Sequence, residues 1–183
     1  MRIISGKSRG TKLFTLEGLE TRPTLDRVKE SLFSIIQSRI VGSTVLDLFS
    51  GSGAIGLEFA SRGASKVYLC DNSKEAAKII NSNIEKTHLQ EKVSLYNMDF
   101  KDALKKVKEI KFDIIFLDPP YSTSFVKEAV EQILKYDCLK EDSLIIVETD
   151  EEERITSEIE NLDVEVIDKR KYGRAHIIFM QKR

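Results

Sequence analysis

The chain has 183 residues, of which 41% are hydrophobic and 32% charged, so it can bury the core of one domain. Its formal net charge of -1 indicates no particular partner. It contains two cysteines without metal-site spacing, and no apolar stretch typical of a secretion signal or a membrane span. These features exclude disulfide-framework and membrane-spanning classes, and they predict a soluble, cytoplasmic protein that binds no metal.

The charges are spread unevenly along the chain. Residues 1–41 carry eight basic and four acidic side chains, and residues 169–183 carry six basic and no acidic ones. Between them, residues 137–168 carry thirteen acidic and two basic side chains. If the two basic ends met in space, they would form a phosphate-binding patch. The alternative is that these stretches are solvated faces of the domain.

The first forty residues do not follow the pattern of the rest. Arg2–Ile4 and Lys12–Phe14 are predicted to pair as a small basic hairpin around Gly6 and Gly10. With little core of its own, this hairpin is typical of an attached recognition element. Thr24 is predicted to cap a helix that follows. An apolar stripe at helical spacing, expected to pack against a sheet, consists of Leu25, Val28, Leu32, Ile35, Ile36 and Ile40.

From residue 42 onward, predicted strands and helices alternate. The predicted strands are Thr44–Phe49, Lys66–Asp71, Val93–Asn97, Phe112–Leu117 and Ser143–Glu148. Predicted helices cover 54–62, 73–87 with Ser73 as N-cap, 100–107, 124–136 and 151–160. Val164–Lys169 and Ala175–Gln181 flank Tyr172-Gly173 as an antiparallel hairpin. This order predicts an α/β doubly wound fold, with a largely parallel sheet and an antiparallel edge strand.

A glycine-rich loop follows the first of these strands. Gly51, Gly53 and Gly56 form a complete G-x-G-x-x-G, and Asp71 ends the second strand 20 residues after Gly51. Glycines allow a sharp turn and a close approach to a ligand, and an acid at that position can accept both ribose hydroxyls of an adenosine. Adenosine is common to NAD and S-adenosylmethionine, so the loop alone does not choose between them.

Two further acids refine the cofactor site. Asp47, at the end of a buried strand, is awkward beside a pyrophosphate but suits the cationic methionyl end of S-adenosylmethionine. The alternative for Asp47 is a polar group that caps the loop. Asp99 is placed to accept the adenine amino group, with Phe100 beside the ring. The predicted cofactor-binding residues are Asp47, Ser50, Gly51, Gly53, Asp71, Asn72, Asp99 and Phe100.

The motif Asp118-Pro119-Pro120-Tyr121 follows the fourth strand, at the end where open α/β sheets keep their sites. An exocyclic amine on an aromatic base is a poor nucleophile, because its lone pair is delocalised into the ring. The Asp118 carboxylate and the Pro119 carbonyl can both accept its N–H hydrogens, and Tyr121 can stack on the base. A rigid turn capped by Asp118 is the alternative. Together with the glycine loop, the motif predicts an amino-methyltransferase.

At these residues the chain resembles the N6-adenine/N2-guanine class of S-adenosylmethionine-dependent methyltransferases. It resembles more closely the RsmD family of bacterial 16S rRNA guanine-N2 methyltransferases, over nearly the whole chain. The specific part of the resemblance is Arg22-Pro23-Thr24 with Asp26-Arg27-Val28-Lys29-Glu30. Ala175 departs from the family, which usually has Thr or a similar polar residue there.

The resemblance implies a Rossmann-like class I methyltransferase fold, with a seven-stranded, mostly parallel sheet and one antiparallel strand. It also implies that a guanine 2-amino group of 16S rRNA is methylated, within the small ribosomal subunit or its assembly intermediate. Residues 1–23 would then be a basic hairpin extension and residues 24–183 the methyltransferase domain, in a monomer. The bases predicted to contact RNA are Arg2, Lys7, Arg9, Lys12 and Arg22, with Lys169, Arg170, Lys171 and Arg174 as a second group.

Three other functions compete with this interpretation. The same motif serves adenine-N6 methylation of DNA, although the chain shows no DNA target-recognition domain. An NAD-dependent oxidoreductase would use Gly51–Gly56 and Asp71 but would leave Asp118-Pro119-Pro120-Tyr121 unexplained. A non-catalytic RNA-binding assembly factor could keep the fold without needing the acid of that motif.

Overall fold

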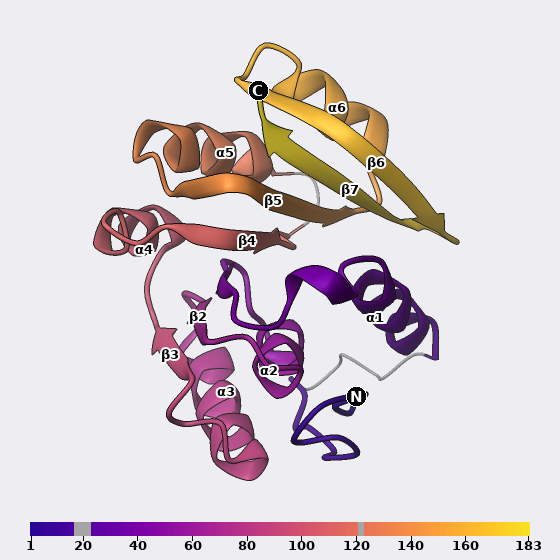
Figure 1. The fold of residues 1–183 in the computed structure, drawn as a ribbon, viewed down its shortest axis with the longest axis vertical. Helices are drawn as coiled ribbons and strands as arrows, with labels where there is room; N and C mark the ends of the chain where they lie inside the picture. The colour runs from indigo at the N-terminus through magenta and orange to yellow at the C-terminus, as the bar shows by residue number, and fades with distance from the viewer. Residues whose placement is uncertain (17–22, 121–122) are drawn as a thin grey trace.

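The computed structural model describes residues 1–16, 23–120 and 123–183. Within these, six α-helices and seven strands alternate along the chain until the last two strands, which follow each other directly (Figure 1). The helices are α1 (Pro23–Ile35), α2 (Ala54–Ser61), α3 (Lys74–Thr87), α4 (Phe100–Lys106), α5 (Phe125–Lys135) and α6 (Glu152–Ile159). The strands are β1 (Thr44–Asp47), β2 (Lys66–Cys70), β3 (Val93–Tyr96), β4 (Phe112–Leu117), β5 (Leu139–Thr149), β6 (Val164–Tyr172) and β7 (Ala175–Lys182).

The strands form one sheet in the order β3-β2-β1-β4-β5-β7-β6. The first five strands in this order pair in parallel, as expected for strands joined by helices. β7 pairs antiparallel with both β5 and β6. The predicted α/β sheet is confirmed, but the prediction that the antiparallel strand lies at the edge is wrong. β7 lies one strand inside, because its middle residues are buried while β6 is mostly polar and exposed.

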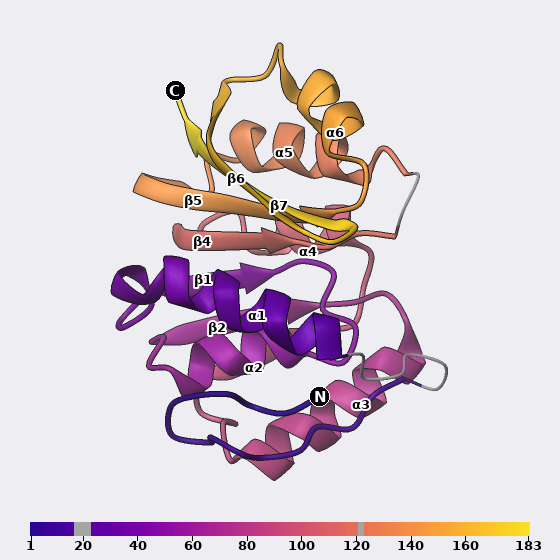
Figure 2. The same cartoon turned by 90° about the vertical axis from the view of Figure 1, so that its right-hand side faces the viewer.

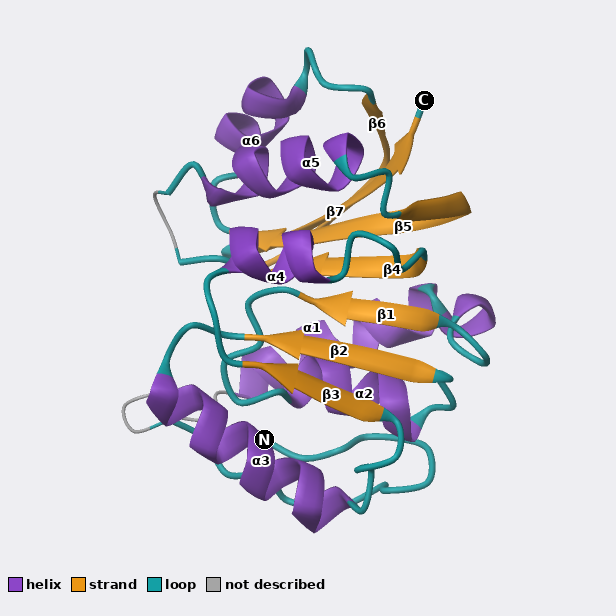
Figure 3. Ribbon diagram, turned by 90° about the vertical axis from the view of Figure 1, so that its left-hand side faces the viewer, coloured by secondary structure: helices purple, strands orange, loops and turns teal. Residues whose placement is uncertain are grey.

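Helices cover both faces of the sheet (Figures 2 and 3). One hydrophobic core joins α1, α2 and α3 to the sheet, and its members include Leu32, Phe59 and Ile80. The second core joins α4, α5 and α6 to the opposite face, with Leu104, Val130 and Ile155 among its members. This two-faced burial is why β4 reads as a continuous apolar run rather than an alternating one.

The predicted elements match the structure closely in the middle of the chain. β4 covers Phe112–Leu117 as predicted, and Ser73 caps α3 by accepting a hydrogen bond from the amide of Ala76 at 3.2 Å. β5 begins four residues before its prediction, at Leu139, which pairs with Phe112. Residues 140–142 are exposed, so their polar sequence gave no sign of a strand.

The first helix differs from its prediction at both ends. α1 begins at Pro23, a residue favoured in the first helical turn, so Thr24 lies inside the helix rather than capping it. Ile35, predicted to pack with the apolar stripe, is 41% exposed because α1 ends there and a short 3₁₀ turn follows. The prediction of burial is confirmed for Val28, Leu32, Ile36 and Ile40. The side chain of Leu25 is not among those that the structure describes.

The N-terminal segment, residues 1–16, packs against α2 and α3. The predicted pairing is present as a single antiparallel bridge between Arg2 and Lys12. Ile3 and Leu13 are buried in the same core as α1, α2 and α3. At Gly6 a Cβ atom would lie 1.9 Å from the carbonyl oxygen of Ser61, so only glycine permits this close approach. The segment thus shares the core of the domain instead of standing apart from it.

Candidate active site

A pocket of about 550 Å³ lies at the carboxyl ends of the parallel strands. Its volume is in the range of small-molecule and cofactor sites. It brings together nine of the predicted catalytic and cofactor residues, which are Asp47, Ser50, Gly51, Asp71, Asn72, Asp99, Phe100, Asp118 and Pro119. Tyr121 and Arg22 lie outside the described residues. β1 and β4 are neighbours, and this pairing places the glycine loop next to Asp118-Pro119.

The glycines of the loop have different roles. Gly51 adopts a left-handed φ of 54° at the pocket wall, with no atom within 4 Å of where a Cβ would be. Gly53, also left-handed, starts α2 and does not line the pocket, which differs from its predicted place. At Gly56 a Cβ would lie 2.0 Å from the Leu69 side chain, so this glycine allows α2 to pack closely on β2.

Asp71 and Ser50 hold the loop in shape. The carboxylate of Asp71 accepts hydrogen bonds from the amides of Gly51 and Ser73, both at 2.9 Å. The Ser50 hydroxyl donates to the carbonyl of Asp47 at 2.8 Å and accepts from the amide of Cys70 at 3.0 Å. Ser50 therefore lines the pocket with a hydroxyl that is already committed to the protein, whereas Asp71 keeps free lone pairs.

Asp47 is a buried acid at the end of β1, beside the loop. Its side chain is 1% exposed, and one oxygen accepts a hydrogen bond from the amide of Gly56 at 3.1 Å. The other oxygen, Oδ1, is buried and has no hydrogen-bond partner among the described residues. Burial raises the pKa of Asp47 to about 7, and the nearby charge of Asp71 adds to this rise. An unpaired buried carboxylate oxygen at a pocket wall fits a ligand that brings a positive charge.

An aromatic wall lies beside the predicted adenine site. Phe100 is buried, and its ring centroid lies 5.2 Å from that of Phe49 and 5.1 Å from that of Phe125. All three rings line the pocket. Asp99 caps α4 by accepting from the amide of Lys101 at 2.9 Å, and as a residue it is exposed where it lines the pocket. Phe49 and Phe125 were not predicted as site residues, since an apolar residue beside a strand or helix usually indicates core.

Asp118 stands beside a second carboxyl group that the sequence analysis missed. β4 and β5 are paired at Leu117 and Val147, so the next residue of each strand, Asp118 and Glu148, lines the pocket. Asp118 lines the pocket and keeps an exposed surface there. Desolvation by the surrounding protein atoms raises its pKa well above the usual range, and the charges of Glu148 and Asp47 add to the rise. Burial also raises the pKa of Glu148.

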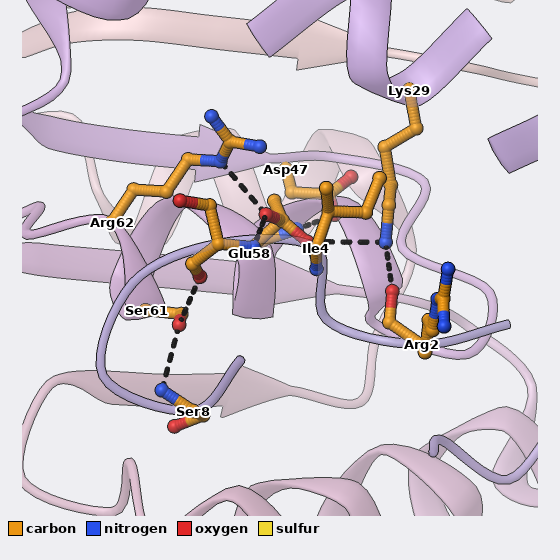
Figure 4. Close-up of polar contacts among 10 residues, drawn as sticks. Arg2, Ile4, Ser8, Lys29, Asp47, Glu58, Ser61 and Arg62 are labelled. Carbon is orange, nitrogen blue, oxygen red and sulfur yellow. Dashed lines mark hydrogen bonds and ion pairs between the residues drawn. The ribbon is translucent and has the colours of Figure 1, made fainter. Parts of the chain in front are cut away.

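The charge balance of the pocket favours a cationic ligand. Five carboxyl groups line it, those of Asp47, Asp71, Asp99, Asp118 and Glu148, and Lys29 is the one basic side chain among the described lining residues. Lys29 is 2% exposed, and burial lowers its pKa. Its ammonium lies 3.2 Å from Glu58 and donates to the carbonyl of Arg2 at 2.6 Å (Figure 4). The cationic charge of Lys29 is thus already neutralised within the protein.

The basic side chains at the two ends of the chain do not form one patch. The N-terminal segment lies beside α2 and α3, while the β6–β7 hairpin forms the other edge of the sheet (Figure 1). Exposed bases without an ion pair among the described residues are Arg2, Lys7, Arg9 and Lys12 in the segment and Lys171 and Arg174 in the hairpin. Lys169 pairs with Glu152 at 2.6 Å, and Arg170 with Asp168 at 2.9 Å.

The residues that the structure describes contain neither a metal-ligand cluster nor a membrane-spanning helix. No group of three or more His, Cys, Asp or Glu side chains in residues 1–16, 23–120 and 123–183 is arranged to hold a metal ion. No helix in the same ranges has the length and apolar character needed to cross a membrane. Both cysteines are buried, and burial raises the pKa of the Cys70 thiol to about 12.

A family model described as "Conserved hypothetical protein 95" matches residues 1–181. The chain belongs to this family. Among its relatives is "Putative rRNA methyltransferase YlbH" of Bacillus subtilis, 36% identical over the full length of both chains. "Ribosomal RNA small subunit methyltransferase D" of Haemophilus influenzae is 37% identical over 83% of this chain and 80% of that protein. The resemblance to the RsmD family inferred from the motifs is therefore confirmed.

Solved structures share the fold of this chain. A putative methyltransferase from Escherichia coli superposes with a TM-score of 0.82 at 26% identity, covering 100% of this chain and 98% of that one. A putative methylase from Haemophilus influenzae gives a TM-score of 0.78 at 30% identity, covering 99% and 97%. The chain thus has the class I methyltransferase fold that its resemblance to the RsmD family implied.

Proposed function

We propose that this protein is an S-adenosylmethionine-dependent methyltransferase that methylates the exocyclic 2-amino group of a guanine in 16S rRNA. The observation that carries the proposal is the placement of Asp118-Pro119 and the glycine loop in one pocket, at the ends of paired strands. Two family relatives are named as an rRNA methyltransferase, one of them as putative, and these names support ribosomal RNA as the substrate.

The pocket residues suit each part of the proposed cofactor, which supplies an electrophilic methyl group on a sulfonium. Asp71 would accept the ribose hydroxyls, and Asp99 with the Phe100 ring would hold the adenine. Asp47 would face the methionyl ammonium, giving its unpaired Oδ1 a partner. The carboxyl groups of the pocket favour this cation over the pyrophosphate of NAD, which argues against the oxidoreductase alternative.

Asp118 and Pro119 would prepare the guanine amine. Their oxygens accept its two N–H hydrogens, drawing the nitrogen toward tetrahedral geometry so that its lone pair can attack the methyl carbon. The N–C bond forms as the C–S bond breaks, and the electron pair of the broken bond stays on sulfur. The methylated nitrogen then releases its extra proton, and the raised pKa of Asp118 makes its carboxylate a strong acceptor for that proton. The stacking role of Tyr121 stays a prediction from the sequence.

The substrate would be a nucleotide splayed out of its stack, because the reacting carboxyl group lies inside a pocket. The exposed bases of the N-terminal segment would contact the surrounding phosphates, within the small ribosomal subunit or its assembly intermediate. Such a substrate would place the protein in the cytoplasm. The monomeric state stays a prediction.

The test is methyl transfer from labelled S-adenosylmethionine to small ribosomal subunits that lack base methylation, followed by nucleoside analysis. We expect label in N2-methylguanosine of the 16S rRNA. Label in N6-methyldeoxyadenosine, when DNA replaces the subunits in the same assay, would support the DNA methyltransferase alternative instead. Cofactor binding without transfer to any nucleic acid would support the non-catalytic assembly factor.

Removing the charges of Lys7 and Arg9 together is expected to weaken RNA binding and to flatten its salt dependence. Both residues are exposed, and neither forms an ion pair with a described residue, so their charges are available to phosphate. Each lost phosphate contact lowers the slope of log affinity against log salt by about 0.7 to 0.9. The measurement is RNA binding by K7A/R9A across a salt series, with cofactor binding expected to stay unchanged.

The matched control is K105A/K108A, which removes one exposed lysine of α4 and one just beyond its end, on the opposite face of the sheet. We expect its salt slope to equal that of the unmodified protein. A slope for K7A/R9A that does not differ from this control would show that the N-terminal segment does not contact the RNA.

A further inference from the structure

One buried side chain of α3 bonds two distant parts of the chain. Asn83 is 0% exposed, and its Oδ1 accepts a hydrogen bond from the amide of Phe14 at 2.8 Å. Its Nδ2 donates to the carbonyl of Phe14 and to the carbonyl of Ser52, both at 2.9 Å. These three bonds use both hydrogens of the amide group and its oxygen, so the side chain is fully committed to holding the two backbones.

The two backbone segments that Asn83 bonds, at Phe14 and at Ser52, both belong to the wall of the pocket or adjoin it. Ser52 belongs to the glycine loop and lines the pocket next to Gly51. Phe14 is followed by Thr15 and Leu16, which line the pocket as well. Asn83 therefore fixes the position of the cofactor loop relative to the N-terminal segment, at the point where the two meet in one wall.

The other polar anchors of the segment do not reach this loop. Glu58, which is 0% exposed, accepts from the amides of Ile4 and Ser5 at 2.8 and 3.0 Å, and Ser61 accepts from the amide of Ser8 at 3.0 Å (Figure 4). These bonds tie the segment to α2. Among the described side chains, Asn83 alone hydrogen-bonds both the segment and residues 50–53 of the glycine loop.

We propose that Asn83 is a positioning residue that couples cofactor binding at the glycine loop to RNA binding at the N-terminal segment. The inference rests on the proposed function, because it assigns the cofactor and the RNA to these two parts. A ligand that orders the loop also orders the segment through the shared amide, which lowers the entropy cost of binding the second ligand. By linkage the effect is reciprocal, so RNA tightens cofactor binding by the factor by which cofactor tightens RNA binding.

The test compares S-adenosylmethionine affinity with and without saturating small ribosomal subunits. In the unmodified protein we expect the subunits to lower the cofactor Kd about fivefold or more. N83D keeps the size of the side chain and can still accept from the amide of Phe14, but it cannot donate to either carbonyl. We expect N83D to raise the cofactor Kd about tenfold and to bring the ratio of the two Kd values close to one.

The matched control is S8A. It removes the 2.7 Å bond from the Ser8 hydroxyl to the carbonyl of Thr87, which joins the same segment to the same helix without touching the glycine loop. We expect S8A to lower thermal stability but to keep the Kd and the ratio of the unmodified protein. Equal losses of the ratio in S8A and N83D would overturn the proposal, since they would show a general loosening of the segment.

A measurement on the unmodified protein keeps the proposal testable if N83D does not fold. Hydrogen exchange of the Phe14 amide, bonded to Asn83, should slow when S-adenosylmethionine binds, together with that of Gly51. The amide of Lys7, bonded to the carbonyl of Ser61, should keep its rate. Bound cofactor with an unchanged rate at Phe14 would overturn the coupling alone. No cofactor binding at all would overturn the proposed function, and the coupling with it.

Discussion

Replacing Asp118 by asparagine is expected to lower the rate of methyl transfer about 10³-fold. Asparagine keeps the shape of the side chain but carries no negative charge and cannot take the proton released by the methylated amine. Cofactor affinity should change by less than about tenfold, because Asp47 and Asp71 hold the cofactor in this proposal. The measurement is single-turnover transfer of a labelled methyl group, alongside cofactor titration.

Asp113 offers a matched control for this substitution. It lies on β4 as well, but its carboxylate accepts from the amide of Thr44 and from Lys140, both at 2.7 Å, and it does not line the pocket. D113N should therefore transfer methyl groups at nearly the rate of the unmodified protein. Turnover by D118N equal to that of D113N would refute the role of Asp118.

The pH dependence of turnover provides a second check on Asp118. Its ionised form is the active one, so the rate should rise as the pH increases through its pKa. Glu148 raises that pKa by repulsion, and E148Q removes the repelling charge. The rising limb of the pH–rate profile should therefore move to lower pH in E148Q. A limb that stays in place would assign the titration to another group.

Replacing Asp47 by asparagine is expected to stabilise the ligand-free protein at pH 8 while weakening cofactor binding about 100-fold. Burial with only one oxygen hydrogen-bonded raises the pKa of this carboxyl from 3.8 to about 7, which corresponds to a cost of at most about 4 kcal/mol when it is ionised. Asparagine cannot ionise, and its oxygen can still accept from the amide of Gly56. A gain of half that cost would raise the Tm by about 6 °C.

The destabilisation by ionised Asp47 depends on pH. The folded protein binds the proton more tightly than the unfolded chain, so the cost is fully present above pH 7 and disappears as the pH falls toward 4. The Tm difference between D47N and the unmodified protein should therefore shrink over that range. A D47N protein that is less stable at pH 8 would contradict the unpaired state of Asp47 Oδ1.

The affinity for the cofactor should also depend on pH through the ionisation of Asp47. A bound cation lowers the pKa of Asp47, so the unmodified protein should lose affinity as the pH falls below 7, by up to about tenfold for each pH unit. D47N should show a shallower dependence, because only the remaining acids of the pocket titrate. Calorimetry across this range measures both proteins, and parallel curves would remove Asp47 from the cofactor site.

The sequence predicts those structural elements that are determined by residues close together in the chain. An apolar run bounded by Asp118-Pro119-Pro120 was enough to predict β4 to the residue, since both faces of that strand are buried. The pattern of Gly51 and Gly53 predicted the loop, because sharp turns need left-handed backbone. The order of strands and helices likewise predicted the parallel sheet.

The missed features depend on contacts between distant segments. Glu58 and Asn83 are polar residues on helices, a pattern that usually indicates a solvated face, yet the N-terminal segment covers both of them. Glu148 joins the site only because β5 lies next to β4. In each case the position of the partner follows from tertiary packing, and no spacing within the chain indicates it.

The position of β7 has a consequence for how the chain folds during synthesis. Residues 175–182 leave the ribosome after β5 and β6, yet they lie between those two strands in the sheet. Until they emerge, residues 145–149 of β5, which β7 covers in the complete sheet, present an unpaired edge of backbone groups to the surroundings. A nascent chain that has emerged from the ribosome as far as residue 174 therefore contains nearly all of the core residues. Its sheet still lacks β7, so the edge of β5 is uncovered. The edge of β5 is then the surface at which a chaperone or another nascent chain can pair with it.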